Sequence, residues 1–166
     1  SVRGADACVE CLTGFHQSRV GRGACVMCGV GTYSPQAATA CTPCAAGEED
    51  HDANASTACR SCVAGRYAAA GSYSLPSNGT VGCIACAAGY ADLDGPSTPC
   101  TVCASGKYAG VGATTCTACP KGQYDNDTTT VFPSASTPCV RCPIGFFSPL
   151  QAVTCTHCPS GYHDDD

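Results

Sequence analysis

Nine C-x-x-C pairs hold all 18 cysteines of this chain, and a glycine follows the second cysteine of every pair by three residues. The pairs are Cys8/Cys11, Cys25/Cys28, Cys41/Cys44, Cys59/Cys62, Cys83/Cys86, Cys100/Cys103, Cys116/Cys119, Cys139/Cys142 and Cys155/Cys158. Self-similarity of this kind is the signature of a repeat architecture. The sequence therefore predicts one tandem array over 1–166, with an incomplete module at each end and about eight modules at 8–28, 25–44, 41–62, 59–86, 83–103, 100–119, 116–142 and 139–158.

The composition limits how such an array can be stabilised. Val, Ile, Leu, Phe and Met together number only 23 of 166 residues, and there is no Trp. Cysteine at more than a tenth of a chain is typical of a disulfide scaffold, in which cross-links replace a core. We therefore expect a small disulfide-rich fold, an elongated tandem ladder of short β-strands and turns with no large hydrophobic core.

Repetition reduces the possible cysteine pairings, because each module should bond as its neighbours do. Two regular schemes remain. In the sequential scheme, the second cysteine of each motif bonds to the first cysteine of the next motif. In the crossed scheme, motifs bond in twos by crossed pairs, which leaves one motif without a partner because nine is odd. We favour the sequential scheme, in which each bridge closes a loop that contributes roughly 3 kcal/mol in the chain-entropy model. It leaves Cys8 and Cys158 for partners outside the segment and predicts the bridges Cys11–Cys25, Cys28–Cys41, Cys44–Cys59, Cys62–Cys83, Cys86–Cys100, Cys103–Cys116, Cys119–Cys139 and Cys142–Cys155.

Each module also has a common internal plan. An aromatic residue stands four or five positions after most second cysteines, as Tyr33 and Phe147 do. We expect the glycine to adopt positive φ in a turn and the aromatic ring to cover the disulfide. Since every bridge joins adjacent motifs, we expect each module to contact only its neighbours, as in solenoid proteins.

The sequence also carries signals of cellular location. Cysteine pairs at this density indicate an oxidising compartment, either extracellular or at the cell surface. Three N-glycosylation sequons, at Asn54, Asn78 and Asn126, lie outside every C-x-x-C motif. No stretch of 18 apolar residues is present, so we expect no direct membrane insertion of this segment. Because Cys158 opens a module that the sequence does not close, we expect the chain to be part of a longer array.

Other site chemistries are weaker interpretations. Zinc ribbons also use paired C-x-x-C motifs, but nine motifs do not divide evenly among four-cysteine sites, and a redox centre needs one reactive thiol. We therefore expect no cofactor. Acidic residues could ligate calcium, but they match no calcium-loop spacing, so we expect solvated acidic loops at Glu48 to Asp52, Asp92/Asp94, Asp125/Asp127 and Asp164 to Asp166.

Neither catalysis nor nucleic-acid binding is indicated. The histidines, His16, His51, His157 and His163, are scattered and lack a carboxylate or serine pattern for acid/base or nucleophilic chemistry. The net charge of −5, with eight dispersed basic residues, argues against a nucleic-acid partner. We expect a protein that is not an enzyme.

The module C-x-x-G-x-Y-S…A-T-x-C-T-x-C, clearest between Cys28 and Cys44, resembles the ephrin-receptor-like cysteine-rich repeat. More distantly it is similar to the first part of tumour-necrosis-factor-receptor modules. The resemblance covers Cys8 to Tyr162 and implies core-poor ladders of short strands that stack end to end. Such repeats occur in receptor ectodomains, adhesion molecules and surface coats.

These observations predict an extracellular structural or adhesive glycoprotein segment that forms a rod or filament, with N-linked glycans and with self-association or neighbouring repeats as partners. The alternative is the ligand-binding ectodomain of a cell-surface receptor.

Overall fold

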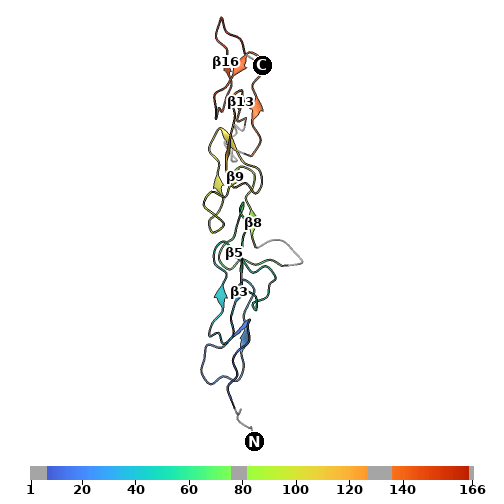
Figure 1. Cartoon of the computed structure of the whole chain (residues 1–166), viewed down its shortest axis with the longest axis vertical. Coiled ribbons are helices and arrows are strands. Elements are labelled where there is room, and N and C mark those ends of the chain that lie inside the picture. The colour runs from blue at the N-terminus through green and yellow to red at the C-terminus, as the bar shows by residue number, and fades with distance from the viewer. Residues whose placement is uncertain (1–6, 76–81, 127–135, 165–166) are drawn as a thin grey trace. The chain divides into compact units, whose positions relative to one another are not determined.

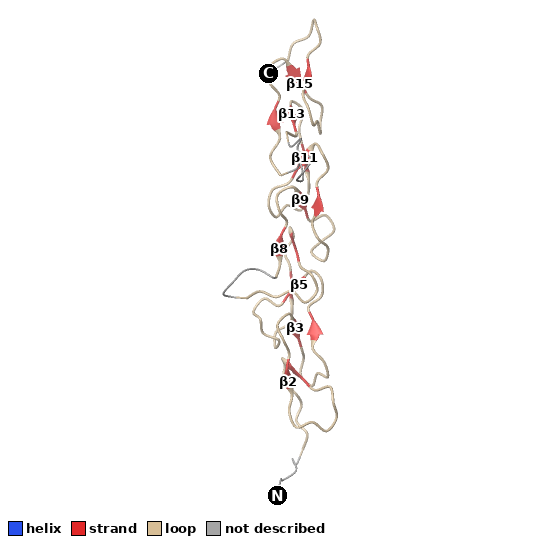
Figure 2. Cartoon of the chain, turned by 180° about the vertical axis from the view of Figure 1, so that it is seen from behind, coloured by secondary structure: helices blue, strands red, loops and turns tan. Residues whose placement is uncertain are grey.

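The chain is built from short β-hairpins. The computed structural model describes residues 7–75, 82–126 and 136–164, and throughout these ranges the chain forms two-residue strands and turns without a helix. Figure 2 shows the strands in red, joined by tan loops. The described residues therefore include no helix that is long and apolar enough to span a membrane.

Each hairpin pairs two strands of one module in antiparallel register. The first strand follows the module's glycine directly; these strands are β1 Phe15–His16, β3 Thr32–Tyr33, β5 Glu48–Glu49, β7 Arg66–Tyr67, β9 Tyr90–Ala91, β11 Lys107–Tyr108, β13 Gln123–Tyr124 and β15 Phe146–Phe147 (Figure 1). The second strand consists of the two residues inside the next C-x-x-C motif; these strands are β2 Val26–Met27, β4 Thr42–Pro43, β6 Arg60–Ser61, β8 Ile84–Ala85, β10 Thr101–Val102, β12 Thr117–Ala118, β14 Val140–Arg141 and β16 Thr156–His157.

The spacing of the cysteine motif follows from this arrangement. The two residues between the cysteines form a strand, and the cysteine after them extends the pairing, as when the Cys44 N–H donates to the Gly31 carbonyl at 2.9 Å. The motif glycines adopt positive φ directly before the first strand, for example 75° at Gly31 and 80° at Gly65. Glycine reaches this region without the steric cost of a side chain, which explains its place in every module.

Eight disulfides join the described cysteines, and they are the eight pairs of the sequential scheme. Their Cα–Cα distances lie between 5.5 and 5.7 Å, within the usual range for a disulfide. Cys8 and Cys158 are free. Hairpin and disulfide together make each module a closed loop, so the fold is a small disulfide-rich ladder.

The chain forms two compact units. One contains Ser1–Cys62 and Ala68–Cys83, and the other contains Val63–Tyr67 and Ile84–Asp166. Within each unit, modules of two kinds alternate. We call 8–28, 41–62, 83–103 and 116–142 the odd modules, and 25–44, 59–86, 100–119 and 139–158 the even modules; a ninth module, of the odd kind, begins at Cys158.

The two kinds differ in how the glycine N–H is used. In odd modules it donates to a backbone carbonyl of the next even module: Gly14 to Ser34 (3.0 Å), Gly47 to Ala68 (2.8 Å), Gly89 to Ala109 (2.8 Å) and Gly122 to Ser148 (3.1 Å). Each of these acceptors stands three residues after the glycine of its own module. In even modules the glycine N–H donates to a side chain instead.

The expectation that modules contact only their immediate neighbours is wrong. The Gly31 backbone lies against the Gly71 carbonyl, two modules further along: a Cβ built on Gly31 would be 2.2 Å from that oxygen. A turn at Gly71 makes this approach possible, and its N–H donates to the Cys44 carbonyl at 2.8 Å. Packing therefore links some of the described modules to the second neighbour as well as to the first.

The buried residues are small, as the composition predicts. One cluster contains Ala91, Cys103 and Ala109, and another contains Cys62, Ala68 and Cys83. No aromatic ring belongs to either cluster, and Phe147 is 48% exposed. Disulfide sulfur and alanine methyl groups, rather than aromatic rings, fill the interior of these modules.

Candidate functional site

A carboxylate occupies the same place in successive odd modules. Each even-module glycine donates its N–H to an aspartate that stands three residues after the glycine of the next odd module. The pairs are Gly31 with Asp50 (3.0 Å), Gly65 with Asp92 (3.0 Å), Gly106 with Asp125 (2.9 Å) and Gly145 with Asp164 (2.6 Å). The corresponding positions of the even modules hold Ser34, Ala68, Ala109 and Ser148, which are 2–5% exposed.

The sequence interpretation of the first three of these aspartates as solvated is wrong. Asp50, Asp92 and Asp125 are 3%, 8% and 5% exposed. A buried N–H without an acceptor is costly, and a carboxylate makes a stronger hydrogen bond to it than a neutral acceptor does. The aspartate two residues further on was also predicted to be solvated. This prediction is confirmed where the residue is described, since Asp52 and Asp94 are exposed. Asp127 and Asp166 lie outside the described residues.

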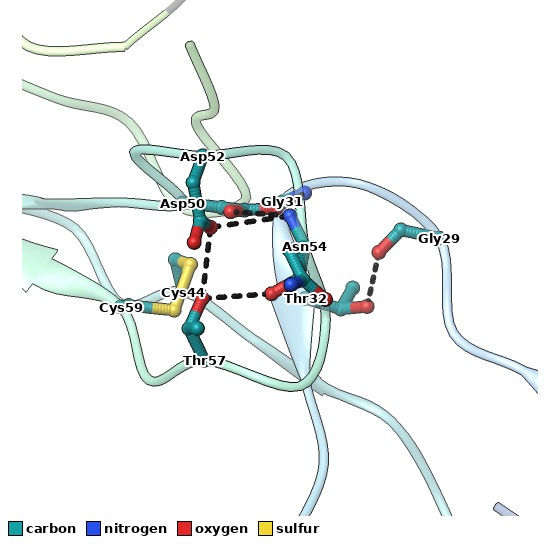
Figure 3. The surroundings of a disulfide bond; sticks show 9 residues. All are labelled: Gly29, Gly31, Thr32, Cys44, Asp50, Asp52, Asn54, Thr57 and Cys59. Carbon is teal, nitrogen blue, oxygen red and sulfur yellow. Dashed lines mark hydrogen bonds between the residues drawn. A yellow bond between two sulfur atoms is a disulfide. The ribbon is translucent and has the colours of Figure 1, made fainter. Parts of the chain in front are cut away.

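Figure 3 shows the first of these carboxylates beside the Cys44–Cys59 disulfide. The Asn54 N–H donates to Asp50 Oδ1 and to Asp52 Oδ1, each at 3.2 Å. The Thr57 hydroxyl donates to Asp52 Oδ1 at 2.8 Å. This bond lowers the pKa of Asp52; burial acts in the opposite direction, and the Asn54 N–H, His51 and Asp50 lower it further. The loop after β5 thus supplies donors to Asp50 Oδ1 and Asp52 Oδ1, while Asp50 Oδ2 accepts from the Gly31 N–H of the module before it.

The equivalent loop of the third odd module lacks one donor. Asp92 Oδ1 is buried and has no hydrogen-bond partner within residues 7–75, 82–126 and 136–164. In the Asp50 loop the donor is the N–H of Asn54, four residues on; four residues after Asp92 stands Pro96, which has no N–H. Both loops place a positive-φ residue just before this position, Ala53 at 54° and Gly95 at 90°. The unpartnered oxygen is therefore explained by one proline.

A second acidic residue, Glu49 in β5, connects module 41–62 to the long even module 59–86. It is 6% exposed, and its carboxylate accepts from the Cys83 N–H (2.9 Å), the Ser74 hydroxyl (2.7 Å) and Arg60 (3.2 Å). Burial acts to raise the pKa of Glu49, but the bonds from Cys83, Ser74 and Arg60 outweigh burial and lower it. Gly82 allows this approach, because a Cβ there would lie 2.0 Å from Glu49 Oε2.

The asparagines of two of the three sequons, Asn54 and Asn126, are among the described residues. Asn54 is exposed, and its Oδ1 accepts from the Ser56 N–H (3.1 Å) and hydroxyl (2.6 Å). Nδ2, the atom to which a glycan attaches, is therefore the free end of that amide. Asn126 is also exposed, 3.4 Å from the Tyr124 hydroxyl. Asn78 lies outside the described residues.

Among the residues that the structure describes, one group has the geometry of a metal site. His16 Nδ1 lies 3.1 Å from Cys41 Sγ and 3.7 Å from Cys28 Sγ. The two sulfurs are bonded to each other, however, and a metal binds the thiolate form of cysteine. This arrangement therefore places an imidazole beside a disulfide and offers zinc no thiolate.

The remaining histidines do not join it. His157 of β16 packs on Phe146, with ring centroids 4.0 Å apart, and His51 is exposed. His163 lines a hollow near the end of the described chain.

Sequence reasoning missed the alternation of carboxylate and small residues, although a signal was present. The third residue after each motif glycine, read along the chain, is Gln17, Ser34, Asp50, Ala68, Asp92, Ala109, Asp125, Ser148 and Asp164. No protein-family model and no curated protein matched this chain in searches of both.

Proposed function

We propose that this chain is a segment of an extracellular structural or adhesive glycoprotein, in which tandem modules form a rod or filament of a surface coat or appendage. The eight disulfides of the described chain support a non-cytosolic, oxidising location. The resemblance to ephrin-receptor-like repeats supports the same class of protein. Self-association or neighbouring repeats are the proposed partners, with N-linked glycans on Asn54, Asn78 or Asn126.

The observation that carries the proposal is the repeated link between modules. Gly31 with Asp50 and Gly106 with Asp125 are examples of a carboxylate that binds the module before it. Turns also reach to the second neighbour, as at Gly71. Such contacts can be repeated indefinitely, because each depends on nearby modules and not on one shared core. A structural protein that gains length by adding modules requires this property.

Solution scattering of the 166-residue chain, secreted from a eukaryotic host, tests the proposed shape. A globular chain of this length has a radius of gyration of about 15 Å. We expect a value well above it, with a constant cross-section over the length of the particle. A monodisperse globular particle with a radius near 15 Å would reject the rod and favour the receptor-ectodomain alternative.

Mass spectrometry of the same material tests the glycoprotein assignment. We expect glycan on at least one of Asn54, Asn78 and Asn126. The matched variants change the hydroxyl residue of each sequon, as in Ser56→Ala, and should remove glycan at that asparagine alone. Three bare asparagines in material from the native source would contradict passage through the secretory pathway.

A further inference from the structure

Turns of the even modules make two contacts that recur along the described chain. Their N–H groups donate to the carbonyl of the second cysteine in an earlier motif: Ala37 to Cys11, Gly71 to Cys44, Gly112 to Cys86 and Gln151 to Cys119, each at 2.8 Å. Their carbonyls lie against the glycine two modules earlier: Gly71 on Gly31, Gly112 on Gly65 and Gln151 on Gly106. One turn thus covers a glycine and satisfies a cysteine carbonyl.

The two groups that receive these contacts, a motif glycine and the carbonyl of a motif's second cysteine, occur once more at Gly145 and Cys158. No described residue lies within 4 Å of a Cβ built on Gly145, whereas at Gly31, Gly65 and Gly106 the covering carbonyl would be 2.0–2.2 Å away. Among the backbone bonds of the described residues, none reaches the Cys158 carbonyl. Cys158 also has a free thiol. No described residue therefore covers this acceptor surface.

The odd modules show the same difference. A Cβ on Gly14 would meet the Ser56 nitrogen at 3.0 Å, whereas Gly122 has nothing within 4 Å. Beside Gly122 lies a hollow of about 590 Å³, lined by Phe146, Phe147, Pro159 and Tyr162 among others. Phe147 is 48% and Tyr162 76% exposed. Apolar area of this kind gains from being covered.

We infer that this surface binds one further module of the even kind, joined through a disulfide to Cys158. The bond forms by thiol–disulfide exchange with a disulfide-carrying oxidant of the oxidising compartment: the two thiols lose two protons and two electrons, and the oxidant's own disulfide is reduced to two thiols. This inference rests on the proposed repeat array and adds the kind of module that fits. The incoming turn would donate its N–H to the Cys158 carbonyl and place its own carbonyl on Gly145. Its residue three after the glycine would accept the Gly161 N–H through the backbone, as Ser34 accepts that of Gly14.

The chemistry of that residue excludes an odd module that carries aspartate there. Ala68 and Ala109, at the corresponding position, are each 2% exposed, and their carbonyls already receive the preceding glycine N–H. An aspartate placed there would be buried without that donor, which is costly.

A second copy of this chain does not supply the required module. Cysteine spacing alone would allow a bond from Cys158 to Cys8 of the copy. The module that then follows contains Gly14 and Gln17, and Gly14 donates to a backbone carbonyl as the odd glycines do. Two odd modules would stand in sequence, so we do not expect the copy to occupy this surface.

The test extends the full chain after Asp166 with a copy of residues 95–119. This addition completes the ninth module and adds a copy of even module 100–119. We expect the Cys158 thiol to disappear and to be recovered by peptide mapping in a bond to the appended copy of Cys100. A matched extension carries Ala109→Asp in the appended copy only, and should give a lower melting temperature than the first.

Gly145→Ala reports on the contact itself. In the extended chain the new Cβ would meet the incoming carbonyl, so we expect this substitution to lower the melting temperature by at least about 3 °C more than in the 166-residue chain. Gly21→Ala, in module 8–28, is the control: its φ of 75° resembles the 83° of Gly145 and no described residue lies within 4 Å of its added Cβ. This control should lower the melting temperature by the same amount in the extended chain and in the 166-residue chain.

Three results would overturn the inference: an equal loss from Gly145→Ala in both chains, an aspartate extension as stable as the alanine one, or no bond between Cys158 and the appended Cys100. Scattering and glycan mapping do not enter these readouts. The inference can therefore fail while the proposed function stands, and the reverse also holds.

Discussion

At the scale of single residues, the position three after each motif glycine decides how a module binds its neighbours. Asp50 and Asp125 are buried and accept a glycine N–H, whereas Ala109 offers only its backbone carbonyl. Sequence reasoning identified the acidic residues but placed them in solvent. Their burial could not be predicted from one module, because the donor belongs to the module before it.

Replacing Pro96 should stabilise the protein. In Pro96→Ala the new N–H can reach Asp92 Oδ1, as the Asn54 N–H reaches Asp50 Oδ1. A hydrogen bond to a charged group contributes about 1.5–3 kcal/mol, and loss of the proline costs about 0.4–1 kcal/mol through the unfolded chain. We expect a net gain of roughly 1 kcal/mol in chemical denaturation. Pro99→Ala is the control and should only lose stability; a loss of the same size at Pro96 would contradict our account of the orphaned oxygen.

Glu49 should make stability depend on acid. Its pKa in the folded protein is lowered from the ordinary 4.5, so its contribution to stability is fully present above that value and is lost as pH falls through the folded pKa. We expect the wild-type melting temperature to fall below pH 4.5 more steeply than that of Glu49→Gln. Glu48→Gln, in the same strand, is the matched control. If the melting temperatures of wild type and Glu49→Gln fell in parallel with pH, this carboxylate would not contribute to the acid dependence of stability.

At the scale of elements, each module is a hairpin of two short strands, each of two residues, closed by a disulfide. This much follows from the cysteine spacing. The residues between two cysteines form one strand, and a glycine at positive φ begins the other. The contact of Gly31 with Gly71 could not be predicted in the same way. It depends on how a turn is placed against a glycine two modules earlier, which the spacing within one module does not determine.

Covered and uncovered glycines should respond differently to the same substitution. Gly65 and Gly122 have φ of 80° and 77°, so alanine costs similar backbone strain at both. A Cβ on Gly65 would lie 2.0 Å from the Gly112 carbonyl, whereas Gly122 has nothing within 4 Å. We expect Gly65→Ala to cost about 1–3 kcal/mol more in the free energy of unfolding than Gly122→Ala. Equal costs in urea denaturation would show that the second-neighbour contact contributes nothing.

At the scale of the whole molecule, covalent closure takes the place that a core has in other proteins. The disulfide scaffold was predictable because so few large apolar residues are present. Many of those that exist lie on the surface, such as Ile144 at 88% and Leu12 at 69% exposure. The alternation of modules emerges only at this scale, since it relates residues of successive modules that a single repeat does not contain.

Reduction should therefore unfold the chain at room temperature. A disulfide typically contributes about 2–4 kcal/mol, and a native domain has only about 5–15 kcal/mol in total, so the loss of eight bridges exceeds any reserve. The hydrogen bonds between modules cannot compensate, because they form only where the bridges hold the hairpins in register. We expect the hydrodynamic radius and the amide proton exchange of the reduced, alkylated chain to be those of an unfolded polypeptide. Alkylation without reduction, which modifies only Cys8 and Cys158, is the control and should leave both unchanged. Protected amides in the reduced chain would show that the small alanine clusters and the aspartate–glycine bonds can hold the ladder without covalent closure.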